Sequence, residues 1–229
     1  MSLKWFFVSG TDTDVGKTLI ATGLLQLAKQ RGFRTAAVKP VAAGCILTEG
    51  LLRNSDALQL QGACSYSLSY QQVNPIALRS PIAPHIAAEE EGVSFSAADL
   101  TQHCLTLTDL PIDVVFVEGA GGWRVPIGIE QTMSDVAVGL RCQVILVVGM
   151  RLGCLNHALL TREAILKDGL ALAGWVANLL EPEMPRLKEN IATLSELFEE
   201  PCLGMVPRLA HPTGGSAAAH LKLPDALEV

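Results

Sequence analysis

The sequence predicts an α/β fold in which one parallel β-sheet carries helices on both faces. Short apolar runs alternate with longer stretches of helical periodicity, which is the pattern of repeated β-α units. The apolar runs in the middle of the chain are continuous, as expected when both faces of a parallel sheet are covered. No repeat, low-complexity block or linker divides the 229 residues, so we expect one domain over residues 1–229.

Short apolar runs supply the candidate strands, in chain order. They span residues 4–9, 35–38, 112–117, 143–148, 173–177 and 202–206. Four stretches between them have helical character. They span residues 17–31, 97–109, 155–167 and 184–199.

Local signals set the ends of these helices. Gly32 follows the first, Gly169 lies just beyond the third, and Pro201 lies beyond the fourth, as at helix C-termini. Ser96, with Asp99 three residues later, predicts an N-terminal capping box for the second helix. The stretch from Cys64 to Val93 contains three prolines, so we expect a long surface excursion there.

Composition excludes several classes of protein. Charged residues make up only 17% of the chain, against about 25% in typical domains, so disorder and a supercharged surface are excluded. The formal net charge of −6 is opposite in sign to that of most nucleic-acid-binding proteins, so we expect no nucleic-acid partner. The low charge content also leaves too little charge to cover a lone globule, and composition by itself leaves open what covers the rest.

The cysteines and the apolar runs favour a cytoplasmic protein. The 6 cysteines have no C-x-x-C or zinc-ligand spacing and are expected to be buried thiols in a reducing compartment. The run Trp5–Val8 is too short for a signal-peptide core. The run Val144–Met150 is also short and is followed by Arg151, so we expect no membrane segment.

The most specific motif is Gly10-Thr11-Asp12-Thr13-Asp14-Val15-Gly16-Lys17-Thr18, between a predicted strand and a predicted helix. A Gly-rich turn that enters a helix points backbone N–H groups and the positive end of the helix dipole at one spot, where phosphates bind. Lys17 is placed to neutralise the β- and γ-phosphate oxygens, and the Thr18 hydroxyl to bind Mg²⁺. Five residues, rather than four, separate Gly10 from Gly16, so this is a variant P-loop. The expected architecture is that of a P-loop NTPase.

Two carboxylates are candidates for the same metal ion. Glu118 ends a central strand at its carboxyl edge, where α/β sheets bind ligands, and Gly119 and Gly121 follow it. Asp56 is a second candidate, although it could equally be a charge at a helix N-terminus without function.

Three further features carry alternative interpretations. Lys39 ends the second strand at the same edge as the P-loop, so it is either a solvated lysine or a cation for phosphoryl transfer. Asn156 and His157 lie at the start of a predicted helix after Gly153. They either cap this helix or contribute to an anion-binding site at its N-terminus. The tryptophans are expected in the core or in pocket walls.

Taken together, these motifs resemble the dethiobiotin synthetase family. The resemblance rests on GTDTDVGKT, AVKPVAAG, LRNSDAL, VNPIAL, SPIAPHIAAEEEG, VEGAGGW, ILVVGMRLGCLNHALLT and LAGWVAN, in that order. It covers about Phe7 to Pro207. It implies a homodimeric P-loop enzyme that uses ATP and Mg²⁺ to join 7,8-diaminopelargonate and CO₂ into the cyclic urea of dethiobiotin, through a carbamic–phosphoric anhydride.

The resemblance also implies roles for individual residues. Lys17, Lys39 and Thr11 would be catalytic, and Thr18, Asp56 and Glu118 would bind the metal. The implied ATP contacts are Asp14, Val15, Gly16, Lys17, Thr18, Leu19, Asp56, Glu118, Gly119, Ala120, Gly121, Asn178, Pro207, Arg208 and Leu209. The implied substrate contacts are Thr11, Lys39, Ala43, Gly153, Cys154, Leu155 and Asn156, the last four across a dimer interface.

The sequence departs from the family at several positions. Asp14 stands where Glu is common, Ala43 where Ser is common, and Leu179 where an acid is common. The alternatives are a related P-loop cofactor-pathway ligase or a regulatory P-loop domain, both of which should lack the VNP and GCLNH segments. A ParA-like switch ATPase would need a basic patch or a membrane helix, and this acidic chain predicts neither.

Overall fold

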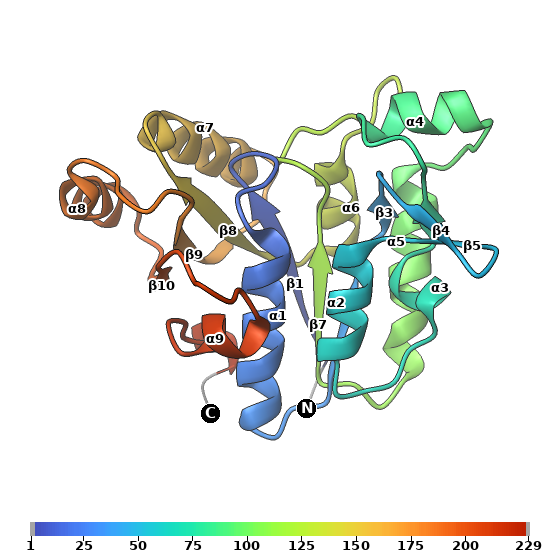
Figure 1. Cartoon of the computed structure of the whole chain (residues 1–229), viewed down its shortest axis with the longest axis horizontal. Helices are drawn as coiled ribbons and strands as arrows, with labels where there is room; N and C mark the ends of the chain where they lie inside the picture. Colours follow the sequence, from blue (N-terminus) through green and yellow to red (C-terminus); the bar gives the residue numbers. More distant parts are fainter. Residues whose placement is uncertain (1–2, 228–229) are drawn as a thin grey trace.

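Six parallel strands form the central sheet, in the spatial order β10-β9-β8-β1-β7-β2 (Figure 1). The computed structural model describes residues 3–227. The strands are β1 (Lys4–Gly10), β2 (Thr35–Val38), β7 (Val114–Glu118), β8 (Gln143–Met150), β9 (Leu172–Leu179) and β10 (Cys202–Val206). All the predicted strands are confirmed, with ends that differ by at most two residues.

Helices cover both faces of this sheet, as predicted. Figure 1 shows α1, α2 and α9 in front of the sheet and α6 and α7 behind it. The helices are α1 (Lys17–Gln30), α2 (Ser55–Ala63), α3 (Tyr70–Val73), α4 (Pro84–Glu91), α5 (Ala97–Leu105), α6 (Met133–Leu140), α7 (Cys154–Lys167), α8 (Leu187–Leu197) and α9 (Gly214–Ala218). Short 3₁₀ turns follow at η1 (Thr106–Asp109) and η2 (Asp225–Leu227).

The position of β1 in the sheet creates the ligand-binding edge. β1 pairs in parallel with β7 on one side and with β8 on the other. The chain runs from β1 to β2 in one direction across the sheet, and from β7 to β8, β9 and β10 in the other. Such a reversal opens a crevice at the carboxyl ends of the strands, and α/β proteins bind ligands there.

Aromatic side chains fill much of the core around β1. Phe6 stacks on Phe116 of β7, with ring centroids 5.6 Å apart, and Phe7 meets Trp123 edge to face at 5.8 Å. Trp175 of β9 is fully buried and packs against Phe198. The expectation that Trp123 and Trp175 belong to the core is confirmed.

The expectation of a surface excursion from Cys64 to Val93 is wrong for its central part. Val73 and Leu78 are fully buried in the core. The segment contains α3, the two-residue strand β6 (Ile76–Ala77) and α4, and β6 pairs in parallel with β3 (Val41–Ala42). The segment therefore forms short elements, and its central part is packed into the core rather than looping away from it.

The helical stretch predicted over residues 97–109 is confirmed in extent, since α5 runs to Leu105 and the 3₁₀ turn η1 continues it to Asp109. Pro111 favours extended backbone at Leu110, which has φ −88° and ψ 152°, so the helix cannot continue. The capping box of Ser96 and Asp99 is confirmed. The helix predicted over 184–199 is shorter, at Leu187–Leu197.

Several elements were not predicted. They are α2, α3, α4, α6, α9, the pair β3–β6 and the hairpin of β4 (Ile46–Thr48) and β5 (Leu51–Arg53). All 6 cysteines are free thiols, and Cys64 and Cys202 are only partly buried. Within residues 3–227, every helix is too short or too polar to cross a membrane.

Candidate active site

The loop between β1 and α1 has a backbone shape that only particular residues allow. Gly16, at the N-terminus of α1, has φ +91°, and Asp14 has φ +57°. A Cβ atom on Gly16 would overlap the side-chain amide nitrogen of Asn178. That nitrogen donates a hydrogen bond to the carbonyl of Val15 at 2.8 Å. Asn178 is therefore in contact with the loop from β9, and glycine is required at position 16.

Contacts with β8 hold the other side of this loop. The Thr11 backbone N–H donates to the Val147 carbonyl at 3.0 Å, and the Gly149 N–H donates to the Thr11 hydroxyl oxygen at 3.3 Å. The Arg151 guanidinium forms an ion pair with the carboxylate of Asp12. The loop is thus fixed on both sides, in a shape that can bind an anion.

Lys17 lies in this loop with a weakened affinity for its proton. Its Nζ donates to the Asp12 carbonyl at 3.1 Å, and the side chain is buried. Burial lowers the pKa of Lys17 to about 8, although the nearby Glu118 carboxylate partly opposes this effect. Phosphate oxygens would favour the charged form and reverse this shift.

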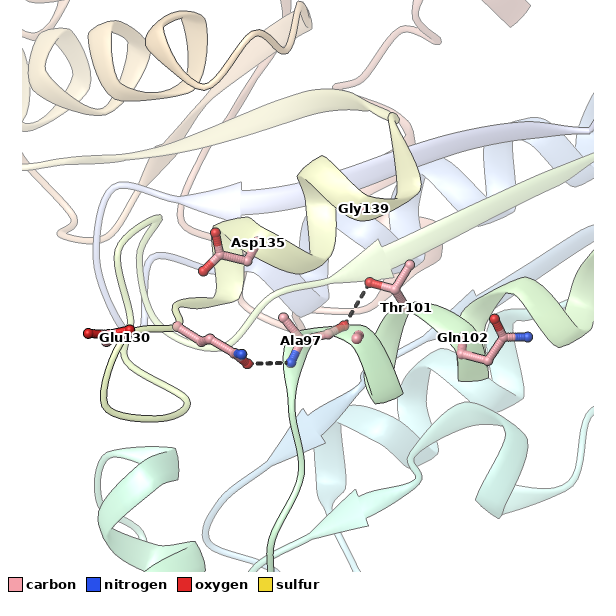
Figure 2. A pocket seen from close by; sticks show the side chains of 8 residues that line it. Ala97, Thr101, Gln102, Glu130, Asp135 and Gly139 are labelled. Atoms are coloured by element: carbon pink, nitrogen blue, oxygen red, sulfur yellow. Dashed lines mark hydrogen bonds between the residues drawn. The ribbon is translucent and has the colours of Figure 1, made fainter.

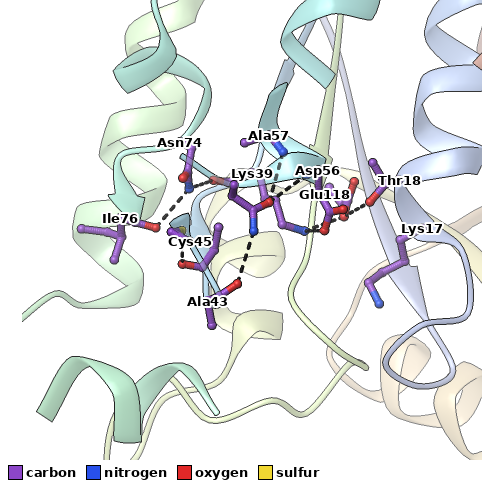
Figure 3. Close-up of polar contacts among 12 residues, drawn as sticks. Lys17, Thr18, Lys39, Ala43, Cys45, Asp56, Ala57, Asn74, Ile76 and Glu118 are labelled. Atoms are coloured by element: carbon purple, nitrogen blue, oxygen red, sulfur yellow. Dashed lines mark hydrogen bonds and ion pairs between the residues drawn. The ribbon is translucent and has the colours of Figure 1, made fainter. Parts of the chain in front are cut away.

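Thr18, Lys39, Asp56 and Glu118 form a second group, here called the carboxylate cluster (Figure 3). Lys39 Nζ lies 2.6 Å from Glu118 Oε1 and 3.3 Å from Asp56 Oδ2. The Thr18 hydroxyl donates to the same Glu118 oxygen at 2.9 Å. The cluster therefore joins the start of α1, the end of β2, the start of α2 and the end of β7.

Burial sets the electrostatics of the carboxylate cluster. Burial is the largest influence on Lys39 and by itself lowers the pKa of its ammonium group, but Glu118 and Asp56 together outweigh it, so the pKa of Lys39 is raised. Lys39 is therefore a permanent cation at neutral pH. Glu118 Oε2 is buried and has no hydrogen-bond partner among the described residues. A buried carboxylate oxygen with free lone pairs is a suitable ligand for a hard cation.

The cap of α2 sets the position of Asp56. Asn54 precedes the helix, and its Oδ1 accepts hydrogen bonds from the N–H groups of Asp56 at 3.0 Å and Ala57 at 3.2 Å. Asp56 thus lies in the first turn of a helix, where the dipole favours its charge. Asp56 also contacts Lys39. Its position therefore agrees with both interpretations from the sequence, a charge at a helix N-terminus and a residue of the functional site.

A cavity of about 920 Å³ joins the P-loop and the carboxylate cluster. Its polar lining comes from both groups, and the rest of its lining is largely apolar. The lining residues are Thr13, Asp14, Gly16, Lys17, Thr18, Leu19, Lys39, Val41, Ala42, Ala43, Asp56, Gln59, Pro81, Ile82, Ala83, Pro84, Glu118, Ala120, Gly121, Val125, Pro126 and Pro212. The cavity can therefore accept an anionic group beside an aliphatic chain.

A second hollow, of about 530 Å³, lies between α5 and α6 (Figure 2). Its polar lining includes the carboxylates of Glu130 and Asp135 and the side chains of Gln102 and Gln131. No lysine or arginine is among its lining residues. Phosphates would therefore be repelled there, and the cavity at the P-loop is the better nucleotide site.

Some residues that the sequence singled out lie outside the cavity lining. Thr11 faces β8, Val15 is buried beneath the loop, and Asn178 supports the loop from β9. Arg208 is exposed and donates to the Leu180 carbonyl at 3.4 Å. The other residues outside the lining are Gly119, Gly153, Cys154, Leu155, Asn156, Pro207 and Leu209.

Other residues near the cavity were not predicted. Gln59, Ile82 and Pro212 line it, and a buried group of Asn54, Tyr70 and Asn74 lies beneath it. For Asn54 a signal was available, because Asn two residues before Asp at a helix start is a common cap. Pro212 and Ile82 come from segments whose path only packing defines, so no local pattern marks them.

Solved structures of low sequence identity share the fold. The septum site-determining protein MinD from Pyrococcus horikoshii, complexed with Mg-ADP, aligns with a TM-score of 0.58 at 15% identity, over 96% of this chain and 87% of that chain. The signal recognition particle receptor FtsY from Elizabethkingia anophelis, in complex with GDP, gives 0.56 at 14% identity, over 100% and 62%. These likenesses show a P-loop NTPase fold.

Curated relatives are much more similar. The ATP-dependent dethiobiotin synthetase BioD of Pseudomonas aeruginosa is 57% identical over 95% of this chain and 96% of its own length. The proteins of the same name from Cellvibrio japonicus and Chromohalobacter salexigens are 56% and 47% identical, over 100% and 96% of this chain and 100% and 98% of their own lengths. The AAA domain family matches residues 4–214. The chain therefore belongs to the AAA domain family and, within it, to the family of ATP-dependent dethiobiotin synthetases.

Proposed function

We infer that this protein is an ATP-dependent dethiobiotin synthetase of biotin biosynthesis. It carboxylates 7,8-diaminopelargonate with CO₂ and closes the ureido ring, with release of ADP and phosphate. The observation that carries this inference is the composition of the cavity, in which the cations and carboxylates of the P-loop and of the carboxylate cluster adjoin a largely apolar lining. A nucleotide triphosphate suits the first part, and a diamine on an aliphatic acid chain suits the second.

The ATP site is the P-loop with its neighbours. The triphosphate would contact residues 14–19 of the loop and α1, and residues 118–121 after β7. Adenine would lie towards Asn178 and Pro207–Leu209, since Asn178 reaches the loop from β9. Pro212 lines the same cavity and extends this region.

Thr18, Asp56 and Glu118 would hold Mg²⁺. The unpaired, buried Oε2 of Glu118 and the hydroxyl of Thr18 beside it are oxygen donors of the kind this ion prefers. Mg²⁺ bound there would offset negative charge on the phosphates. The protein's own part is to hold these oxygens in place, and Lys39 does so by contacting both carboxylates.

Lys17 and Lys39 would promote phosphoryl transfer. One substrate amine captures CO₂ as a carbamate, whose oxygen attacks the γ-phosphate, so two anions must approach each other. The two buried ammonium groups offset this repulsion, and fixed charges in a buried site are effective because they need no reorganisation. The second amine then attacks the carbamate carbon, closes the ring and releases phosphate. Thr11 and Ala43 would hold the carbamate end.

The substrate carboxylate would bind at the start of α7 of a second copy. Gly153–Asn156 lie outside the cavity lining, and among the described residues no side chain caps the N-terminus of α7. Leu152, which precedes this helix, and Leu160, which lies within it, are exposed, as expected for an apolar interface. We therefore propose a cytoplasmic homodimer of single-domain subunits, each of which completes its partner's site.

The test of this function is coupled turnover. Purified protein should release phosphate from ATP and form dethiobiotin only when 7,8-diaminopelargonate, bicarbonate and Mg²⁺ are all present. Omission of each component in turn is the control. Phosphate release at the same rate without the diamine would contradict the assignment.

A further inference from the structure

Tyr70, Asn54 and Asn74 form a buried polar group beneath the cavity, here called the tyrosine network. The hydroxyl of Tyr70 accepts a hydrogen bond from the backbone N–H of Asn54 at 2.7 Å. It donates one to Oδ1 of Asn74 at 3.0 Å. The network therefore joins the start of α2 to the turn after α3, segments that are adjacent only in the folded chain.

Donor and acceptor chemistry fixes every orientation in the tyrosine network. A backbone N–H can only donate, so the Tyr70 oxygen must accept from Asn54, and its own proton is left for Asn74. The Asn74 amide nitrogen donates to the carbonyls of Lys39 at 2.8 Å and Ile76 at 3.0 Å. Since a carbonyl can only accept, the Asn74 amide cannot be turned over without losing its bonds to Lys39 and Ile76.

The network reaches three parts of the cavity wall. Figure 3 shows its member Asn74 together with Lys39, Asp56 and Ala43 of that wall. Through Asn74 it holds the backbone carbonyl of Lys39, whose N–H also donates to Val73 at 2.7 Å. Through Asn54 it holds the first turn of α2, which carries Asp56. The Asn54 side-chain nitrogen donates to the Ala43 carbonyl at 3.3 Å, on the apolar part of the lining.

Burial makes this arrangement rigid. Tyr70 and Asn54 are each 7% exposed and Asn74 is 2% exposed, so water cannot replace a lost partner. The Arg53 guanidinium lies over the Tyr70 ring, 4.1 Å from its centroid, and helps to hold the ring in place. A satisfied polar network in a buried setting specifies one geometry more strongly than apolar packing does.

We propose that Tyr70 is a positioning residue that fixes Lys39, Asp56 and Ala43 relative to one another. The proposal rests on the proposed function, because it assigns Tyr70 to the geometry of that site. Tyr70 itself does not line the cavity. Its hydroxyl links the backbone at Lys39, through Asn74, to the backbone at the start of α2, whereas the Lys39–Asp56 ion pair joins only the ends of two side chains. Its removal therefore breaks the backbone link while the P-loop keeps its contacts with β8 and β9.

The test compares Tyr70→Phe with Tyr66→Phe. These are the only 2 tyrosines of the chain, and the Tyr66 hydroxyl has no hydrogen bond among the described residues, which makes it a matched control. Calorimetry measures the affinity for the non-hydrolysable analogue AMP-PNP with Mg²⁺ and with EDTA. Steady-state assays of dethiobiotin formation give kcat, KM and the half-saturating Mg²⁺ concentration, and the number of AMP-PNP sites counts folded protein.

For Tyr70→Phe we expect at least a tenfold loss of kcat per folded molecule and a several-fold rise in half-saturating Mg²⁺. Affinity for AMP-PNP in EDTA should stay within twofold, while the gain in affinity from Mg²⁺ shrinks. Tyr66→Phe should match the wild type in every measurement. The proposal would be overturned if Tyr70→Phe kept the wild-type kcat per folded molecule and the wild-type half-saturating Mg²⁺ concentration. It would also be overturned if the variant lost the same amount of AMP-PNP affinity with Mg²⁺ as with EDTA.

Asn54→Ser tests the third branch, the contact with Ala43, and keeps that part of the proposal falsifiable if Tyr70→Phe does not fold. Serine keeps an oxygen to cap α2 but loses the amide that reaches Ala43. We expect a several-fold higher KM for the diamine with an unchanged Mg²⁺ response, and an unchanged KM would overturn the proposal. An inactive wild type would instead contradict the proposed function, since the AMP-PNP measurements do not depend on turnover.

Discussion

The P-loop and the carboxylate cluster form two walls of one cavity, but they are built in different ways. Residues 10–18 make the P-loop within a single turn between a strand and a helix, and its shape depends on positive φ angles at Asp14 and Gly16. The carboxylate cluster joins residues from four segments, with Lys39 and Glu118 separated by 79 positions in the chain.

This difference separates two requirements of the site. Binding a triphosphate needs backbone N–H groups in a fixed curve, which local sequence can supply. Reacting a carbamate with that triphosphate needs charges at defined places around it, which only packing between distant elements can supply. Variants of the carboxylate cluster should therefore reduce turnover more than nucleotide affinity, and variants of the P-loop should reduce both.

Lys39→Ala should have the largest effect. Loss of the cation that contacts both carboxylates should lower kcat by about 10²–10³-fold or more, with nucleotide affinity largely unchanged. It also leaves Glu118 buried without its cation, which should cost about 3–5 kcal/mol in the free energy of unfolding. Lys29→Ala, at an exposed position late in α1, is the control. Near-normal turnover of Lys39→Ala would remove Lys39 from the mechanism.

Gly16→Ala should come next, and Gly32→Ala is its matched control. Both glycines have positive φ, +91° and +86°, so alanine costs about 1–2 kcal/mol at either position. A Cβ atom at Gly32 has no neighbour within 4 Å, whereas at Gly16 it meets Asn178. Calorimetry should show at least a tenfold loss of AMP-PNP affinity for Gly16→Ala only. Equal affinities of the two variants would contradict this account of the loop.

The pH dependence of nucleotide binding should show a smaller effect, centred on Lys17. The pKa of Lys17 is lowered to about 8 in the free protein, so the side chain loses its charge as the pH rises through that value. Bound phosphates favour the charged form, so binding takes up a proton and affinity should fall by up to about tenfold per pH unit above 8. Lys17→Arg keeps its charge and should bind with a flatter profile. A flat wild-type profile between pH 7.5 and 9 would contradict the assignment.

Ser96→Ala should have the smallest effect. It removes the cap of α5, far from the cavity, where Ser96 Oγ accepts from the Asp99 N–H at 3.1 Å. Thermal or denaturant unfolding should show a loss of about 1 kcal/mol. The kcat and KM values should be those of the wild type at temperatures where the variant is folded. A change in kcat would mean that α5 is coupled to the site.

Particular residues show how far sequence reasoning extends. The strands around β1 were predicted because continuous apolar runs indicate buried parallel strands, and Glu118 at the end of β7 was predicted with them. The burial of Val73 and Leu78 was not predicted, because the prolines of the 64–93 segment suggested a loop. The pairing of β3 with β6 involves two residues on each side, which is too short to leave a periodic signal.

The sequence by itself determined the fold class and the P-loop, and it named all four residues of the carboxylate cluster as candidates. These features depend on local periodicity, on glycine conformations and on side-chain chemistry, all of which are written along the chain. Only the tertiary structure decided that Lys39 lies between Asp56 and Glu118, that Asn178 supports the loop, and that Tyr70 links α2 to Lys39. These contacts depend on the relative positions of distant elements, which the packing of the whole core sets.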